Sequence, residues 1–452
     1  MQQSNSYLTE GSIIRTVWSI SWPVVSTYFL QTLVSLVDIK MVGSLGQENI
    51  AAVGLATAAL MVVMMLMMGI SIGTTALVAR YSGEGSKEKV KLVIQQSYII
   101  SVLIAMLLVL LGALFSAATI RAMGGDDQVV PVGAGFLRIL SYGSLFLTGN
   151  LIVSAIMLGL GRTKSNLQIL AVINLLNIIG NYLLIYGIGP FPELKANGAA
   201  LASVISRGIG LVWGLKLISS WGYSSKTLQD VFRFNREYVF KILGIGLPVS
   251  VDGVSRRLQI AILNKILSYT IYGTRAISAY TIGLQTEAIS FMPGLAFMSA
   301  ATSLVGHNLG AKKPDRAEES GWTSVRFAAV VMSVLGILLV VFSRQIVGFF
   351  TKDQTVIQIG SHYLIVNGIA QPIMAVNMVL SGALRGAGDA VTPLWISALT
   401  LWGLRVPLSI ILGLTLGLEA DGVWYAMLAS IVISTVFFQI RFRKGEWKKI
   451  RL

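Results

Sequence analysis

Apolar runs long enough to cross a membrane dominate this chain of 452 residues. Each run holds about 20 residues or more, and at about 1.5 Å per helical residue that length spans a hydrocarbon core roughly 30 Å thick. A backbone inside lipid must satisfy its own hydrogen bonds, which a helix does. We place twelve spans at residues 16–43, 48–80, 90–120, 129–158, 164–190, 196–220, 238–269, 276–306, 320–346, 356–384, 391–417 and 421–441. The sequence therefore predicts an all-α integral membrane protein.

The composition agrees and excludes several kinds of chemistry. Hydrophobic residues make up 54% of the chain and charged residues 12%, against roughly 25% charged in soluble domains. The absence of cysteine excludes disulfides, thiolate metal sites and cysteine catalysis. The first run exceeds the length of a signal-peptide core and shows no small-residue cleavage pattern, so we expect it to be retained as a helix. We expect no soluble domain, no enzymatic activity, no cofactor and no metal.

The net charge of +15 reflects topology and not nucleic-acid binding, because Lys and Arg gather in alternate loops. The basic loops and the tail contain Lys87, Lys89, Lys91, Arg162, Lys164, Lys226, Arg233, Arg236, Lys312, Lys313, Arg316, Arg385, Arg441, Arg443, Lys444, Lys448, Lys449 and Arg451. By the positive-inside rule these segments are cytoplasmic, so both termini lie inside, as an even number of spans requires. Anionic lipid headgroups are the natural partner of such loops.

The two halves of the sequence resemble each other in the same order. The segment ATSLVGHNLGA (301–311) resembles TALVARYSGEG (75–85), ALRGAGDAVTPLWI (383–396) resembles MLGLGRTKSNLQI (157–169), and EADGVWYAMLAS (419–430) resembles KANGAALASVIS (195–206). Pro248 likewise corresponds to Pro23, and the offset stays between 224 and 227 residues. A repeat of half the chain length predicts two six-helix lobes with a cavity between them, as in many secondary transporters.

We expect an N-lobe at residues 1–220, a cytoplasmic linker at 221–237 and a C-lobe at 238–452 that ends in a basic cytoplasmic tail. The stretch from Ser219 to Lys241 mixes polar and basic residues with aromatic ones. That mixture favours an amphipathic helix lying on the inner leaflet. A plain connecting loop is the alternative.

Three motifs, in order, resemble the multidrug and toxic compound extrusion (MATE) family. They are VDIKMVGSLGQENIAAVGLA (37–56), SLVGHNLGAKKPDRAE (303–318) and GALRGAGDAVTP (382–393), and with the repeat the resemblance covers about Ile13 to Ile440. The pattern is most similar to the DNA-damage-inducible protein F branch. The resemblance implies two lobes related by a pseudo-two-fold axis along the membrane normal. It also implies efflux of cationic or amphipathic drugs, driven by protons or sodium ions.

Two other transporter groups compete with this interpretation. The major facilitator superfamily also has twelve helices in two halves, but its GxxxDRxGRR loop is missing, since the chain reads RYSGEGSKEK at residues 80–89. Flippases of lipids and lipid-linked oligosaccharides belong to the same wider superfamily as MATE transporters. That alternative stays open.

Asp38 is the sharpest candidate for coupling transport to an ion. It is the only acidic residue inside the first six predicted spans, away from their first residues, and a charge in the membrane needs a partner or a wet cavity. A partly apolar cavity stabilises the protonated form of a carboxyl group, which suits a proton carrier. The resemblance implies the same role, because the matching acidic residue in the family takes the coupling cation. A permanently hydrogen-bonded structural carboxylate is the alternative.

Asn174, Asn177 and Asn181 follow one another on the fifth span, and the last two are four residues apart and so share a helix face. In several relatives the position of Asn181 is an aspartate that completes a sodium site with an asparagine at Asn177. Here that position is neutral, and one carboxylate offers a sodium ion less negative charge than two. We therefore expect cation coupling at Asp38, Asn177 and Asn181, with protons favoured over sodium ions. Interhelical hydrogen bonding is the structural alternative for these asparagines.

The C-lobe contains a second set of charges within its spans. Asp252 and Arg256 are four residues apart and can pair along one helix face. Arg257 then needs an acid, for which Glu287 is the nearest candidate by depth, and Arg405 adds another cation. We expect a network that binds substrate or changes partners during transport. A static, fully paired cluster is the alternative.

The remaining candidates are an adaptable apolar cavity and two isolated histidines. The second span carries Met61, Met64, Met65, Met67 and Met68, and flexible methionines suit varied apolar ligands, although a packed or lipid-facing stripe is the simpler interpretation. We assign Gln31, Met61, Met64, Met65 and Asn174 to the substrate cavity. His307 and His362 are too isolated for catalysis or metal binding, so we expect structural roles. The sequence thus predicts a monomeric inner-membrane antiporter that exports small organic cations or amphipathic drugs in exchange for H⁺ or, second, Na⁺.

Overall fold

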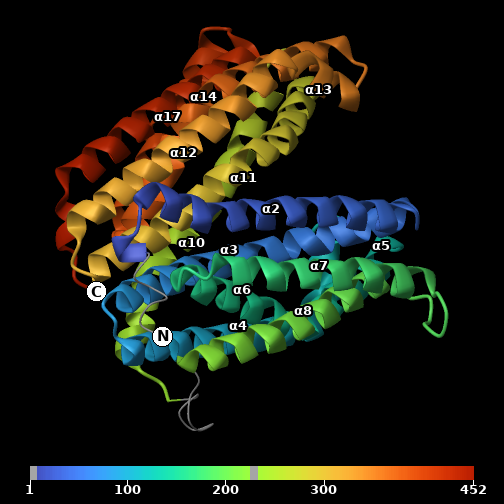
Figure 1. Cartoon of the computed structure of the whole chain (residues 1–452). Coiled ribbons are helices and arrows are strands. Elements are labelled where there is room, and N and C mark those ends of the chain that lie inside the picture. The colour runs from blue at the N-terminus through green and yellow to red at the C-terminus, as the bar shows by residue number, and fades with distance from the viewer. Residues whose placement is uncertain (1–7, 224–232) are drawn as a thin grey trace. The chain divides into compact units, whose positions relative to one another are not determined.

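The structure is a computed structural model that describes residues 8–223 and 233–452, and within these ranges every regular element is a helix (Figure 1). Eleven of the described helices are long and apolar enough to cross a membrane. A further pair, bent by 53°, brings the number of spans to twelve if it counts as one. The predicted all-α membrane protein is confirmed.

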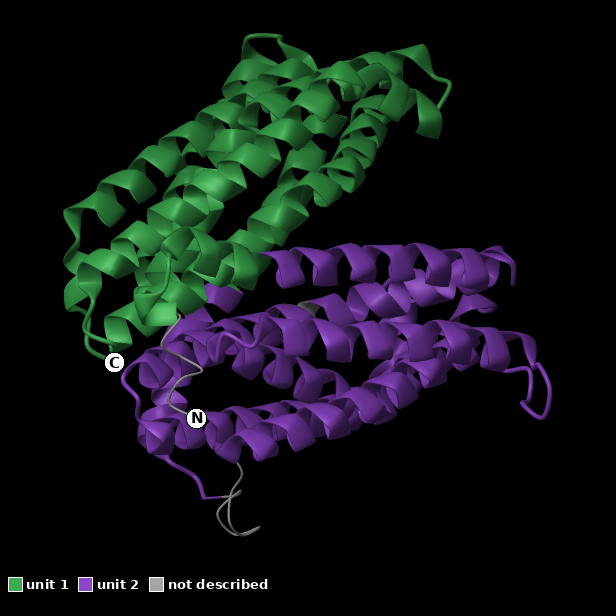
Figure 2. Ribbon diagram, in the orientation of Figure 1, with its two compact units in different colours: residues 1–21, 251–452 green, residues 22–250 purple. Residues whose placement is uncertain are grey.

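The chain divides into two compact units (Figure 2). Unit 2 contains residues 22–250, and unit 1 contains residues 1–21 and 251–452. Both divisions fall inside a helix and close to a proline, at Pro23 in α2 (Ile13–Gly43) and at Pro248 in α10 (Arg236–Ser268). The N-lobe, linker and C-lobe boundaries expected from the sequence stay a prediction.

Unit 2 consists of long helices joined by short turns. Its elements are the part of α2 from residue 22, α3 (Gln47–Gly83), α4 (Lys87–Ala122), α5 (Val129–Tyr142), α6 (Ser144–Gly159), α7 (Thr163–Tyr186), α8 (Ala196–Ile218), the short π-helix η1 (Ser219–Tyr223) and the part of α10 up to residue 250.

Unit 1 contains the corresponding second set. Its elements are the remainder of α10, α11 (Thr274–Gly310), α12 (Pro314–Val341), α13 (Ser343–Phe350), α14 (Gln354–Ala387), α15 (Val391–Ala398), η2 (Leu399–Arg405), α16 (Val406–Ser409), η3 (Ile410–Thr415), α17 (Glu419–Lys444) and η4 (Glu446–Lys449).

Two predicted spans are less regular than expected. The span at 129–158 is broken at Gly143 into α5 and α6, where glycine lowers helix stability by about 1 kcal/mol relative to alanine. The span at 391–417 alternates α-helical and π-helical stretches, with Pro407 in its middle. Proline removes a backbone hydrogen bond, which weakens the regular α-helix around it.

The predicted amphipathic linker helix lies largely outside the described residues, because the description stops at Tyr223 and resumes at Arg233. Where it resumes, the chain is not helical and is held by Gln96 on α4. The Gln96 amide donates to the carbonyl of Arg233 at 3.0 Å and accepts from the backbone N–H of Asn235 at 2.9 Å.

The sequence repeat is also a repeat of side-chain hydrogen bonds. In unit 2 the hydroxyl of Thr75 donates to the carbonyl of Ala155 at 3.0 Å, and in unit 1 Thr302 donates to Gly382 at 2.8 Å. Donor and acceptor are both displaced by 227 residues between the two units. In unit 2 this bond joins α3 to α6, and in unit 1 it joins α11 to α14.

Unusual backbone conformations recur at matched positions too. Lys195 and Glu419 precede or begin α8 and α17 with φ values of 51° and 54°, a region that side chains other than glycine rarely adopt. Gly161 and Gly388, in the turns that follow α6 and α14, have φ values of 70° and 96°. The halves therefore share turn geometry as well as hydrophobic pattern.

Close helix contacts in unit 1 require small residues on α14. A Cβ atom on Gly386 would stand 2.2 Å from the carbonyl oxygen of Thr302 on α11, and one on Gly382 would stand 2.5 Å from that of Met298. These glycines are four residues apart and face α11 together, the spacing that lets membrane helices approach closely.

The first prediction concerns this contact. Gly386→Ala should lower the unfolding free energy by about 1–3 kcal/mol, because the added methyl group meets backbone that must shift. The measurement is the melting temperature of the purified protein in detergent. Gly54→Ala is the control, since nothing lies within 4 Å of its Cβ position on α3, and it should leave the melting temperature unchanged or raise it. Equal melting of the two variants would contradict the packing argument.

Candidate functional site

Asp38 lies half-buried on α2 and is bonded to α7. The Nδ2 atom of Asn181 donates to Oδ1 of Asp38 at 2.6 Å, so the two residues predicted to act together are in contact. Asn181 itself is only 1% exposed. A carboxylate held by an amide group stays hydrogen-bonded whether or not it carries a proton.

Asn177 extends this contact to α8. Its Oδ1 atom lies 3.4 Å from Nδ2 of Asn181, and its own Nδ2 donates to the hydroxyl of Ser203 at 3.0 Å. The Oδ1 atom of Asn181 is buried without a hydrogen-bond partner. Three helices thus present a cluster of oxygen atoms with one carboxylate among them. The predicted residues Asp38, Asn177 and Asn181 form one connected site.

Arg207 on α8 belongs to the same site and was missed by the sequence analysis. It interacts electrostatically with Asp38 and lies one helical turn beyond Ser203. The signal was available, because Arg207 stands in the middle of the sixth predicted span, where a cation needs a partner. Asp38 therefore has a cationic neighbour, although its direct hydrogen bond comes from a neutral amide.

A groove runs between the two helices that carry Asp38 and Asn181. It has a volume of about 580 Å³ and is lined by Val25, Ser26, Phe29, Leu30, Leu167 and Ala171. Asp38 and Asn181 lie eight to ten residues further along α2 and α7 than the nearest lining residues, Leu30 and Ala171. The groove is mostly apolar, so it suits an apolar group more than a hydrated ion.

The cavity candidates are spread over three helices of unit 2. Gln31 is exposed on α2 two helical turns before Asp38, on the same face. Met61 is exposed and Met64 and Met65 are half-buried on α3, and Asn174 on α7 has a buried Nδ2 atom without a hydrogen bond. In the same methionine run, Met67 is fully buried and Met68 is exposed. The structure therefore gives these methionines different surroundings, and their common role in a cavity stays a prediction.

In unit 1, Asp252 is shared between two arginines. Arg385 donates to its Oδ2 atom at 3.0 Å and Arg256 at 3.4 Å. The predicted pair of Asp252 and Arg256 is present, but the shorter bond comes from Arg385. The sequence analysis had placed Arg385 in a cytoplasmic loop, whereas α14 continues to Ala387 and brings this arginine into the bundle, where it is 6% exposed.

Glu287 has partners other than the expected Arg257. Its carboxylate accepts a short hydrogen bond from the hydroxyl of Tyr363 and another from the side chain of Asn367, both on α14. The cation that acts on it is Arg405. The pairing of Glu287 with Arg257 stays a prediction, and the groups that hydrogen-bond the acid are the neutral donors of α14.

Arg405 stands in the π-helical stretch η2 and is bonded to neutral groups. Its Nε atom donates to the hydroxyl of Ser430 at 2.7 Å, and NH1 lies 3.5 Å from Oε1 of Gln259. The predicted charges of unit 1 thus form two clusters, one around Asp252 and one around Glu287.

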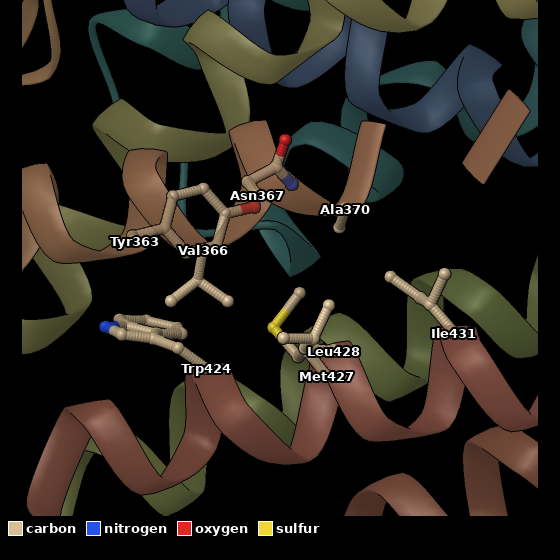
Figure 3. A pocket seen from close by; sticks show the side chains of 8 residues that line it. All are labelled: Tyr363, Val366, Asn367, Ala370, Trp424, Met427, Leu428 and Ile431. Carbon is tan, nitrogen blue, oxygen red and sulfur yellow. The ribbon is translucent and has the colours of Figure 1, made fainter. Parts of the chain in front are cut away.

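A small cavity lies beside Glu287's partners, between α14 and α17 (Figure 3). Tyr363 and Asn367 line it from α14, and Trp424 and Met427 line it from α17. Its volume of about 10 Å³ is room for about one water molecule. A drug-sized ligand does not fit there.

The two histidines occupy unrelated places. His307 is fully buried, and its Nδ1 atom lies 2.9 Å from the carbonyl of Ser303 one turn earlier on α11. His362 is exposed on α14 and pairs with Asp421 at 3.2 Å. These partners fit the expected structural roles.

Repeated helical units with charged sites inside the spans define the class of multi-pass membrane transporters. The MatE family profile matches residues 23–183 and 258–411. The chain therefore belongs to the MatE family, and it is a transporter and not an enzyme.

Relatives and solved structures agree with this assignment. The chain is 26% identical to "Uncharacterized transporter YisQ" of Bacillus subtilis over 96% of this chain and 94% of the relative. It is 25% identical to "Probable multidrug resistance protein NorM" of Thermotoga maritima over 95% of this chain and 92% of the relative. The structure described as "Crystal structure of MATE in the straight conformation" matches with a TM-score of 0.88 at 22% identity, over 98% of this chain and 99% of that one. The match to this solved structure shows that the chain has the same fold.

The second prediction concerns the buried pair of unit 1. Arg385→Gln should lower the unfolding free energy by about 3–5 kcal/mol, because it leaves Asp252 without its closest partner. Adding Asp252→Asn to that variant should restore part of the loss, which a thermal melt in detergent would show.

The control is an exposed pair in unit 2. Arg121 and Asp127 are 3.8 Å apart with side chains 71% and 100% exposed. Arg121→Gln should leave the melting temperature nearly unchanged, since solvent screens such pairs. If Arg385→Gln melts like Arg121→Gln, the buried pair does not stabilise unit 1.

Proposed function

We propose that the protein is a secondary active efflux antiporter of the cytoplasmic membrane, with both termini inside the cell, which exports cationic or amphipathic compounds by alternating access. The names of several relatives, such as "Probable multidrug resistance protein NorM" of Thermotoga maritima, support multidrug efflux. The hydrogen-bonded Asp38 in the membrane-spanning part of unit 2 supports ion coupling. Assignment to the DNA-damage-inducible protein F branch and a monomeric state are part of the proposal.

The coupling ion in this proposal is the proton. This choice rests on the contact between Asp38 and Asn181. A single carboxylate beside an uncharged amide can take up a proton and become neutral, which the low-dielectric interior of the membrane favours. Sodium is the second candidate, because the unpartnered Oδ1 of Asn181 and the oxygens of Asp38 and Asn177 are ligands of the kind hard cations prefer. A sodium ion at these oxygens would meet only one carboxylate, that of Asp38. The positive charge of Arg207 offsets part of the negative charge of this carboxylate.

The proposed cycle uses the charge of Asp38 as the switch. Protonation from outside removes the charge, weakens its attraction to Arg207 and lets α2 rearrange about Pro23, after which the substrate leaves. Release of the proton inside restores a negative site that attracts a new organic cation. The membrane potential assists, because moving one charge across 100 mV is worth about 2.3 kcal/mol.

The third prediction tests the role of Asp38. Asp38→Asn should insert and fold but lose proton-driven efflux of ethidium from vesicles, because an amide group cannot take up and release the proton. Dye fluorescence after an imposed pH gradient measures this. Asp127→Asn removes a carboxylate that is fully exposed and should transport normally. Undiminished transport by Asp38→Asn would end the proposed role.

The fourth prediction separates the two coupling ions. In proteoliposomes, efflux should follow an imposed pH gradient at constant Na⁺ and should ignore an imposed Na⁺ gradient at constant pH. A response to Na⁺ alone would assign the oxygens of Asp38, Asn177 and Asn181 to a sodium site instead. Indifference to dyes under both gradients, with flipping of a fluorescent lipid, would favour the flippase alternative.

A further inference from the structure

Unit 1 exposes arginines at a depth where lipid does not tolerate them. Arg256 and Arg257 are both exposed on α10, and Arg257 stands eleven residues before the end of this helix at Ser268. That is about 16 Å of helix, close to the centre of a hydrocarbon core about 30 Å thick. Charged side chains at such a depth face a protein interior or a water-filled cavity. The exposed part of Arg256 therefore marks a wet surface of unit 1.

Arg256 is incompletely neutralised. Its Nε atom lies 3.4 Å from Asp252 and its NH2 atom donates to the hydroxyl of Ser397 at 2.9 Å. Asp252, however, is already bound by Arg385 at 3.0 Å, so one carboxylate is shared between two guanidinium groups. The side chain of Arg256 remains 46% exposed, whereas those of Asp252 and Arg385 are 6% and 7% exposed. The pair of Asp252 and Arg385 is buried, whereas the remaining positive charge, that of Arg256, lies at the surface.

The neighbouring span extends this surface. The indole Nε1 of Trp402 donates to the hydroxyl of Ser255 at 2.7 Å, beside Arg256 on α10. Arg405, three residues after Trp402, is held by neutral partners. Both residues lie in the π-helical stretch η2, and such stretches are frequent at functional sites. We call Arg256, Trp402 and Arg405 the arginine face.

The charges of this region favour an anion. Around the two clusters of unit 1, three arginines act on two carboxylates: Arg256 and Arg385 on Asp252, and Arg405 on Glu287. A positively charged wet surface repels a simple organic cation and attracts an acidic group. The planar guanidinium group binds carboxylate, sulfonate or phosphate through two parallel hydrogen bonds, and an indole ring offers a flat apolar surface beside it.

We propose that the arginine face binds the acidic group of an amphipathic substrate, with Arg256 as its main ligand. Zwitterionic or anionic amphiphiles are then transported in preference to otherwise identical compounds whose acid is blocked. This inference rests on the proposed efflux function and specifies its substrate class.

The test uses two dyes with the same ring system, rhodamine 110 with a free carboxylate and rhodamine 123 with that group as a methyl ester. In proteoliposomes driven by a pH gradient, the wild-type protein should show a higher kcat/KM for rhodamine 110. Arg256→Gln should reduce that value by about tenfold, the loss expected for a hydrogen bond to a charged group. Transport of rhodamine 123 by the same variant should stay unchanged, which also shows that the variant folds. Arg256→Lys should retain part of the preference, because it keeps the charge without the planar fork.

Arg344→Gln is the matched control, because it removes an exposed arginine on α13, away from the arginine face. It should leave the transport of both dyes as in the wild type. Dye binding to the wild-type protein in detergent adds a measurement that needs no variant: rhodamine 110 should bind more tightly, and its advantage should shrink as salt screens the charge.

Equal handling of the two dyes by the wild-type protein, or an unchanged dye ratio in Arg256→Gln, would overturn the inference and leave the efflux function standing. Transport of neither rhodamine by the wild-type protein would overturn the inference, and absence of ethidium efflux as well would overturn the efflux function.

Discussion

Every charged side chain inside the spans of this protein has to be satisfied without bulk water, and that requirement organises both units. In unit 2, Asp38 is bonded to Asn181, which is linked through Asn177 to α8. In unit 1, Asp252 binds Arg385 and Arg256, and Glu287 accepts from Tyr363 and Asn367. Each acid therefore joins helices that are distant in sequence, so that the polar contacts that satisfy the charges also hold the bundles together.

The partners of these acids differ in a way that bears on function. Asp252 is bound by guanidinium groups, which keep a carboxylate charged, whereas Asp38 and Glu287 accept from neutral amide or hydroxyl donors. A neutral donor allows an acid to gain and lose a proton without breaking an ion pair. This difference separates Asp38 and Glu287, which suit a change of protonation state, from Asp252, which suits a structural role in unit 1.

The sequence predicted the class of fold well, because the length of apolar runs and the internal repeat are properties of the chain alone. It also brought Asp38, Asn177 and Asn181 together correctly, since spacing along one helix and one acid well inside six spans left few choices. It failed where tertiary contacts decide. Arg385 was assigned to a loop because helix ends are poorly defined by hydropathy, and the donors to Glu287 on α14 were not expected because depth alone does not reveal them. Arg207 was simply overlooked, although its place in a span was visible.

The division of α2 and α10 between the units has a consequence for how the chain is made. Residues 8–21 are synthesised before residues 251–452, with which they belong, while unit 2 is complete only once residues 236–250 have followed. Leu8, Val17 and Ile20 share a hydrophobic cluster with Phe297 and Leu304, so these three residues can complete this cluster only after residue 304 has been synthesised. Neither product of a cut between the repeats would contain all the residues of a compact unit, so the folding of each half depends on residues of the other.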